Sequence, residues 1–313
     1  MRAFAFAAAA VVACSGGSDT GTTDGGGTTS GSSSGGGSSS SGSTTSTCSE
    51  VHVGGTNDPA IGGAASSQVI AQSVSDLGGV AAKQVTDLTA TCKSLATALG
   101  ASSSAQASAD GNTDELTKLN AWCQLAVSTM GASKAKAAGT IQVEFDPPKC
   151  KLSVATKAAC QGRCTGSTTP CDTTANPMKC TGGTLANGFC EGGKLEGGCP
   201  VDAKCDAACD ATTIAGADCP SPTVTVTITG AVDAAEAAKL KAAFEANMPA
   251  SLSMKEKCTL EANIVGTFTG TVSAVTDIKP ACIPPLVKAT STAASEIQAC
   301  ASASVSVAGQ IGN

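Results

Sequence analysis

Hydrophobic spacing predicts a helical hairpin near the start of the folded region. From about residue 65 to residue 99, and again after Asn112, apolar residues recur at the three- and four-residue spacing of a helix. Asn112 can cap the second helix, because Glu115 three residues later completes a capping-box pattern. The Ser/Ala/Gly-rich segment between the two stripes is expected to be a loop. The apolar positions are Val69, Ile70, Val74, Leu77, Val80, Val85, Leu88, Cys92, Leu95 and Leu99 in the first helix, and Leu116, Leu119, Trp122, Cys123, Val127 and Met130 in the second.

Strict alternation of apolar and polar residues predicts strands at residues 141–145, 151–154, 223–229 and 304–307. Each segment has one apolar and one polar face, which suits a small sheet that helices cover on one side and that water contacts on the other. Further helices are expected at about 233–247, 252–276 and 284–300. The predicted fold class is α+β, with a helical hairpin, a small helix-covered sheet and a disulfide-rich insertion at residues 150–219.

The cysteines indicate an oxidising compartment. The chain has 17 of them, and setting Cys14 aside leaves an even sixteen that can pair as disulfides. Zinc sites usually contain C-x2-C pairs and histidines, whereas this chain has no C-x2-C and a single histidine, His52. The same absence argues against thioredoxin-like and haem-attachment motifs. We therefore predict structural disulfides and no metal or cofactor.

The N-terminal segment has the features of a cleaved export signal. Arg2 precedes an apolar run, Ala3 to Ala13, that is too short to span a bilayer. The following residues, Val11-Val12-Ala13-Cys14, resemble the bacterial lipobox. The resemblance implies a signal peptide at 1–13, a lipid on Cys14 that binds the membrane, and, because Ser15 is not acidic, sorting to the outer membrane. A soluble secreted protein with an unmodified Cys14 is the alternative.

Residues 15–47 are almost entirely Gly, Ser and Thr, a composition that cannot bury a core. With Cys14 they form a predicted flexible tether, so that 14–47 connects the membrane to a folded domain at 48–313. The net charge is -6 and the lysines are scattered. We therefore expect no nucleic-acid partner and no polybasic membrane patch.

Cysteine spacing predicts part of the disulfide pattern. In the hairpin, Cys92 and Cys123 lie at similar distances from the turn, which favours a bond between them. The ten cysteines of the insertion are separated by 10, 4, 7, 9, 10, 9, 6, 4 and 10 residues, a series that is nearly the same in both directions. We predict nested bonds, with the two C-x3-C pairs as facing helical turns. The predicted pairs are Cys150–Cys219, Cys160–Cys209, Cys164–Cys205, Cys171–Cys199 and Cys180–Cys190.

Local loops between sequential cysteines, such as Cys164–Cys171 and Cys199–Cys205, are the competing arrangement. The partners of Cys48, Cys258, Cys282 and Cys300 stay open.

Two segments match known binding motifs only in part. Residues 110–121 lack the Gly and the final Glu of a calcium-binding EF-hand loop, and Gly188 to Lys194 matches G-x4-G-K without the following Ser or Thr. No catalytic constellation is found, so a non-enzymatic protein is predicted.

The C-terminal region carries a second resemblance. Its C-x3-C pairs, its proline-flanked alternating strand and the segment K-L-K-A-A-F-E-A-N-M-P from Lys239 to Pro249 resemble cysteine-rich envelope lipoproteins of unknown function from predatory soil deltaproteobacteria. The resemblance implies a location in the cell envelope. The first hypothesis is a structural or adhesive envelope lipoprotein with an envelope protein or glycan partner. The alternative is an extracytoplasmic binding module that uses the 150–219 insertion. A deep apolar pocket with convergent polar groups would favour such a module, or an enzyme, over a structural role.

Overall fold

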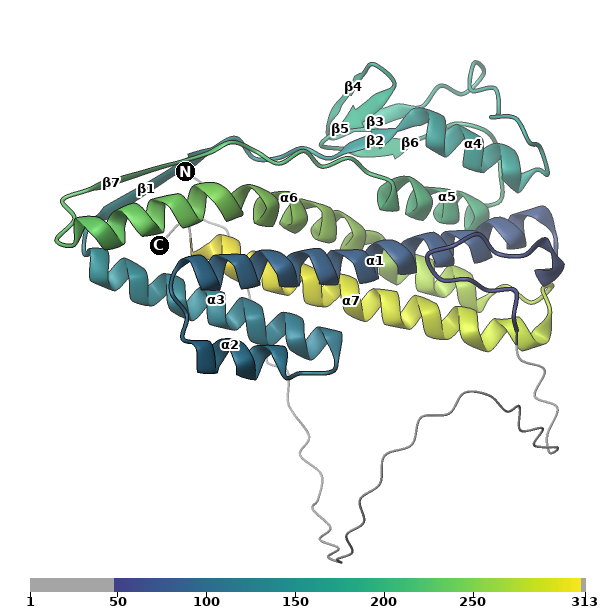
Figure 1. Ribbon diagram of the computed structural model, residues 1–313. Coiled ribbons are helices and arrows are strands. Elements are labelled where there is room, and N and C mark those ends of the chain that lie inside the picture. The colour runs from purple at the N-terminus through teal and green to yellow at the C-terminus, as the bar shows by residue number, and fades with distance from the viewer. Residues whose placement is uncertain (1–47, 311–313) are drawn as a thin grey trace, which may run out of the picture. The chain divides into compact units, whose positions relative to one another are not determined.

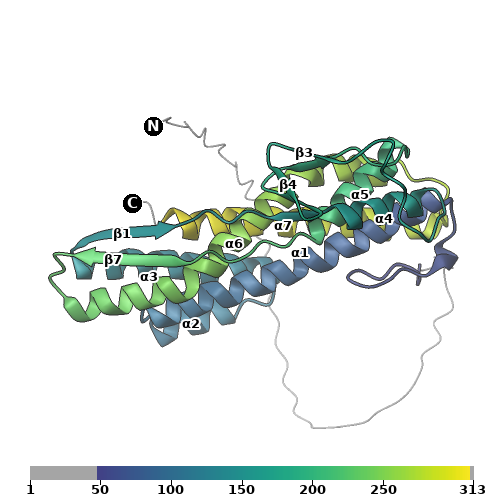
Figure 2. The same cartoon turned by 90° about the horizontal axis from the view of Figure 1, so that it is seen from above.

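The computed structural model describes residues 48–310, and the chain folds there around long helices. Figures 1 and 2 show α1, α6 and α7 side by side, with α3 packed against α1 and α7. We call α1, α3, α6 and α7 the helical scaffold. The helices, with two short 3-10 turns, are η1 (Pro59–Ile61), α1 (Ala65–Ala98), α2 (Ser103–Asp110), α3 (Glu115–Ala137), α4 (Val154–Cys164), α5 (Ala203–Ala215), α6 (Ala234–Ser273), η2 (Pro280–Cys282) and α7 (Ile283–Gly309).

The predicted hairpin forms as α1 and α3, and its apolar stripes are buried. Trp122 and Leu95 are fully buried in a cluster that also receives Phe244 from α6. The predicted loop between the helices is partly wrong, because residues 103–110 form α2. The predicted cap is wrong as well. Asp114 caps α3 by accepting from the Thr117 amide at 2.8 Å, whereas the Asn112 side chain donates to carbonyl oxygens at the end of α2.

The strands form three small antiparallel sheets, and three of the four predicted alternating segments, all except 304–307, contribute to them. The longest pairs β1 (Thr140–Phe145) with β7 (Val224–Thr229), and the valines of β7 face the core while its threonines are exposed. The other sheets belong to the insertion: β2 (Lys151–Ser153), β5 (Phe189–Glu191) and β4 (Thr184–Ala186) form one, and β3 (Lys179–Thr181) and β6 (Lys194–Glu196) form the other. The α+β class is therefore confirmed.

Three sequence-based boundaries need correction. The predicted strand at 304–307 is the last turn of α7, because Cys300, Ser304 and Val307 are all buried and continue its helical stripe. Val154 begins α4 instead of ending a strand. The helices expected at 233–247 and 252–276 are one helix, α6, which contains Pro249. Met248 and Leu252, on either side of this proline, are both buried.

The insertion at 150–219 leaves the scaffold after β1 and returns at β7. Its helices α4 and α5 pack against each other, and α5 also packs against α1 and α6 (Figure 1). The helices of the described part of the chain include none that is both long and apolar enough to cross a membrane. Through the contacts of α5 with α1 and α6, the insertion lies over one side of the scaffold.

Candidate functional site

The structure pairs the predicted cysteines with one another. All six predicted bonds are present: Cys92–Cys123, Cys150–Cys219, Cys160–Cys209, Cys164–Cys205, Cys171–Cys199 and Cys180–Cys190. The four cysteines left open form Cys48–Cys282 and Cys258–Cys300. The competing local loops are not formed. This many disulfides indicates an oxidising location outside the cytoplasm. Cys14 lies outside the described residues.

The two C-x3-C pairs form the centre of the insertion. Each pair places its two sulfurs one helical turn apart, on α4 and on α5, and the facing turns bond to each other. The sulfurs are crowded, since Cys164 Sγ lies 3.6 Å from Cys209 Sγ. A metal needs thiolates as ligands, and all four sulfurs are taken up by disulfides. The cluster therefore acts as a clamp between the helices.

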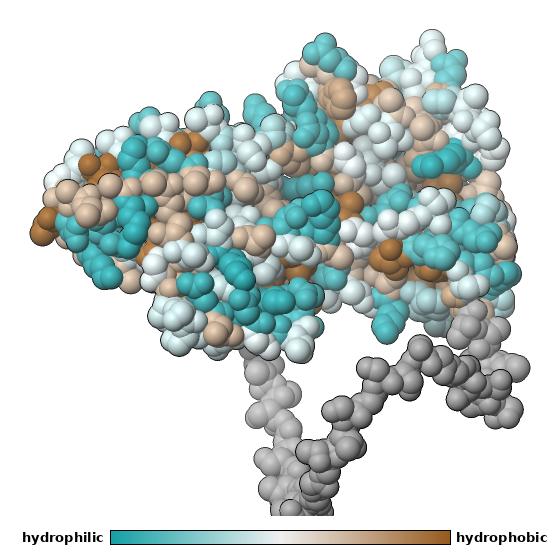
Figure 3. All heavy atoms as spheres, in the orientation of Figure 1, coloured by the Kyte–Doolittle hydropathy of each residue, from teal (hydrophilic) through white to brown (hydrophobic). Residues whose placement is uncertain are grey.

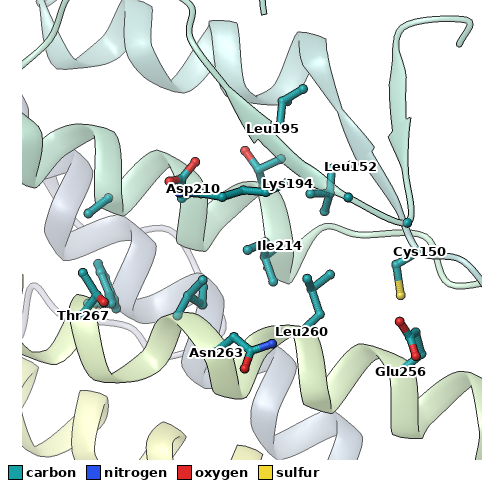
Figure 4. A pocket seen from close by; sticks show the side chains of 16 residues that line it. Cys150, Leu152, Lys194, Leu195, Asp210, Ile214, Glu256, Leu260, Asn263 and Thr267 are labelled. Carbon is teal, nitrogen blue, oxygen red and sulfur yellow. The ribbon is translucent and has the colours of Figure 1, made fainter. Parts of the chain in front are cut away.

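A cavity of about 420 Å³ lies between the insertion and α6 (Figure 4). Its apolar lining comes from both sides: the insertion contributes Leu152, Leu195 and Ile214, and α6 contributes Leu260, Ile264 and Phe268. The local sequence explains these positions. Leu152 and Leu195 are the central, inward-facing residues of β2 and β6, and the α6 residues recur every four positions on one helical face.

A buried ion pair fixes one end of the cavity. Lys157 of α4 is 1% exposed, and its Nζ lies 2.7 Å from Asp210 Oδ1 and 3.5 Å from Asp206 Oδ1. The same ammonium group donates to the Leu195 carbonyl at 3.0 Å. Burial raises the pKa of Asp210, which lines the cavity, and the hydrogen bond from Lys157 opposes that shift. With three acceptors around it, the Lys157 ammonium is satisfied by the protein itself.

Other polar groups face the cavity without a protein partner. Glu256, Asn263 and Thr267 project from α6, and within residues 48–310 their side chains make no hydrogen bond or ion pair. Lys194 contributes a side chain from the insertion, and its Nζ is 3.7 Å from Glu196 Oε1. The cavity therefore combines apolar walls with a few polar groups that are available to a ligand.

The G-x4-G-K match borders the cavity but is not a phosphate-binding loop. Gly192, Gly193 and Lys194 line the cavity, yet they connect strand β5 to strand β6. A phosphate-binding loop leads into the N-terminus of a helix, whose amides hold the anion. The EF-hand-like segment also has another role, because Asp110 accepts from Lys93 and from the indole of Trp122.

Sequence reasoning missed this cavity and its buried lysine. The cavity depends on packing between segments that are far apart in the sequence, which periodicity does not reveal. A signal for Lys157 did exist, since it lies three residues before Cys160 and therefore on the same, inward face of α4. The lining combines apolar side chains with a few hydroxyl, amide, carboxylate and ammonium groups, a composition typical of small-molecule sites. Comparison with known proteins identifies no matching family, no matching curated protein and no matching solved structure.

Proposed function

We propose that this protein is a non-enzymatic, lipid-anchored binding protein of the cell envelope, and that its ligand is a small, largely apolar molecule held in the cavity between the insertion and α6. The cavity is the observation that carries this proposal. Its volume of about 420 Å³ is in the range of small-molecule sites, and its apolar walls and few polar groups are typical of them. Of the two hypotheses from the sequence, the cavity favours the binding module over a purely structural role.

The construction of the two walls supports this function. One wall is α6, which is packed into the scaffold, and the other is closed by disulfides that include Cys150–Cys219 and the two bonds between α4 and α5. Binding to a site that is already formed avoids the cost of ordering its walls. A rigid cavity of this kind is better suited to one ligand shape than a flexible loop surface would be.

The molecular surface offers less support for a broad adhesive face. On the side seen in Figure 3, apolar residues of the described region lie singly or in small groups among hydrophilic ones. Extended apolar patches are the usual mark of protein-protein contact. The proposed contact with the environment is therefore the cavity, while attachment to the outer membrane rests on the lipobox resemblance of Val11–Cys14 and on Ser15.

Ligand capture tests the binding function. The oxidised full-length protein is purified from its native envelope, and bound small molecules are released and analysed by mass spectrometry. A small, largely apolar molecule should be recovered with the wild type. The variant Ala207→Phe places a ring in the cavity and should lose this molecule, whereas Ala242→Phe, at an exposed position of α6 outside the cavity, should retain it. Recovery of the same molecules from both variants, or of none from the wild type, would contradict the proposal.

The membrane anchor has its own test. Mass spectrometry of the native N-terminal peptide should find Cys14 as the first residue of the mature protein, carrying acyl chains. Replacement of Cys14 by Ser should abolish acylation and release the protein from the membrane fraction. An unmodified Cys14, or cleavage at another position, would refute the anchor while leaving the cavity unaffected.

A further inference from the structure

The polar groups of the cavity are arranged along its length. Its floor follows α6 from Glu256 to Thr267, a distance of about 16 Å at 1.5 Å per residue. Figure 4 shows Asp210 and Glu256 at opposite ends, with Leu152, Ile214 and Leu260 between them. A ligand that fills this space therefore has an elongated apolar body and meets a carboxylate at either end.

The two carboxylates differ in what they already bind. Asp210 accepts from the buried Lys157 ammonium at 2.7 Å, so its charge is compensated by the protein. Glu256 is exposed and has no hydrogen bond or ion pair to any residue in the described range. A carboxylate is an acceptor only, and it can receive hydrogen bonds from a donor-rich cation. Glu256 is thus the open position for a charged group of the ligand.

The charges around the cavity favour a cation. The charged residues of the lining are Asp210, Glu256 and Lys194. Asp210 pairs with Lys157, and the Lys194 ammonium lies 3.7 Å from Glu196, so that among these three lining residues only Glu256 has no ion-pair partner in the described range. An anionic ligand would be repelled by the Glu256 carboxylate, whereas a cationic group could pair with it.

From this arrangement we propose that the ligand is an elongated cationic amphiphile, a molecule with an apolar chain and a protonated amine, whose ammonium group pairs with Glu256 while its chain lies against Leu260, Ile264 and Ile214. The inference rests on the proposed binding function, because it specifies the chemistry of the same cavity. It adds a charge preference and names the residue that sets it.

Three probes of equal chain length test the charge preference. Octylamine, octanol and octanoate are titrated separately into the oxidised full-length protein near neutral pH, and affinities are measured by calorimetry. Octylamine should bind more tightly than octanol by up to about fivefold, the upper end of the range for an exposed ion pair, and octanoate should bind most weakly. Glu256→Gln should lower the affinity for octylamine to about that for octanol. Glu144→Gln, an exposed position on β1, is the matched control and should have no effect.

The outcomes separate this inference from the proposed function. Equal binding of all three probes, unaffected by Glu256→Gln, would overturn the amine assignment while the cavity stands as a binding site. Tighter binding of octanoate, lost in Lys194→Gln, would reverse the charge preference and also overturn it. Failure of every probe to bind would count against the proposed function itself.

Discussion

The helical scaffold is stabilised mainly by apolar packing, whereas the insertion is stabilised mainly by disulfides. The scaffold buries large side chains, including Trp122, Phe244 and Phe268, between helices of 23 to 40 residues. The separate core of the insertion contains eight buried residues, and two of these are the disulfide cysteines Cys150 and Cys190. Five of the eight disulfides lie inside the insertion. Disulfides are therefore most frequent in the part of the chain that has the smaller buried apolar core.

The difference shows how a thin core can still present a fixed surface. Apolar burial contributes about 25 cal/mol for each Å², so three-residue strands and short helices gain little from packing alone. A disulfide restricts the unfolded chain, and typically adds about 2–4 kcal/mol whatever the local burial. The insertion can consequently hold Leu152, Leu195 and Ile214 in place as a cavity wall, opposite a helix that is held by packing.

The largest expected effect comes from removing the clamp between α4 and α5. Replacing Cys160, Cys164, Cys205 and Cys209 by Ala should destabilise the protein by about 2–4 kcal/mol for each lost disulfide, as measured by urea unfolding. Hydrogen exchange should show loss of protection in α4 and α5, while α3 stays protected. Cys92→Ala with Cys123→Ala is the matched control, and should leave α4 and α5 protected. Equal loss of protection in both regions would mean that the insertion is not a separately stabilised part.

The disulfides and the apolar stripes were predictable because their signals are local or symmetric. The stripe of α1 follows from side-chain spacing alone, and the mirrored spacing around Cys160 and Cys209 follows from a chain that folds back on itself. Similar reasoning failed at residues 304–307. Four alternating residues are too few to distinguish a strand from a helix end, and the burial of Val307 against the scaffold decides for the helix.

The cavity was beyond sequence reasoning for a different reason. The hydrophobic pattern around Leu152 predicts a strand, and the pattern around Leu260 predicts a helix. Neither pattern indicates that the two side chains line the same cavity. Their proximity follows from how the insertion packs on α6, which is a long-range property of the fold. The pairing of Cys258 and Cys300 was left open for the same reason, because their bond depends on the alignment of α6 with α7.

Trp122 stabilises the scaffold by packing, whereas the disulfides between α4 and α5 stabilise the insertion. Its side chain is fully buried, and its indole Nε1 donates to Asp110 at 3.1 Å. Trp122→Ala should cost about 3–5 kcal/mol, because it removes the largest side chain of the cluster and leaves a cavity. Circular dichroism during urea unfolding measures this loss, and Trp122→Phe should recover part of it. A loss below about 1 kcal/mol would show that the scaffold also depends mainly on its disulfides.

Glu261 makes the scaffold sensitive to pH. Its side chain is fully buried in α6, Gln84 donates to its Oε1 at 2.8 Å, and its Oε2 has no partner within the described residues. Burial raises its pKa from 4.5 to about 7. Between these values the folded protein holds a proton that the unfolded chain has lost, so stability falls as the pH rises through this window, by about 1.4 kcal/mol per pH unit.

Glu261→Gln removes this dependence and keeps a side chain of the same shape. The free energy of unfolding of the variant, relative to the wild type, should therefore rise by roughly 3 kcal/mol between pH 4.5 and pH 7 and then stay constant. Urea unfolding of both proteins over this range measures the difference. Glu115→Gln, at an exposed helix end, is the control. A difference that does not change with pH would contradict the raised pKa.

The smallest expected loss of stability comes from replacing the residue that caps one helix in each region. Asp114 caps α3 in the scaffold by accepting from the Thr117 amide, and Asp202 caps α5 in the insertion by accepting from the amides of Lys204 and Cys205. Each substitution by Ala should cost about 1 kcal/mol in urea unfolding. The disulfide of Cys205 holds the first turn of α5 in place, so this turn cannot fray to hydrate the amides that Asp202→Ala leaves unpaired. The loss should therefore be at least as large for Asp202→Ala as for Asp114→Ala. A negligible effect of Asp202→Ala would mean that the disulfide makes the cap redundant, and that covalent links replace hydrogen bonds in the insertion as well as apolar packing.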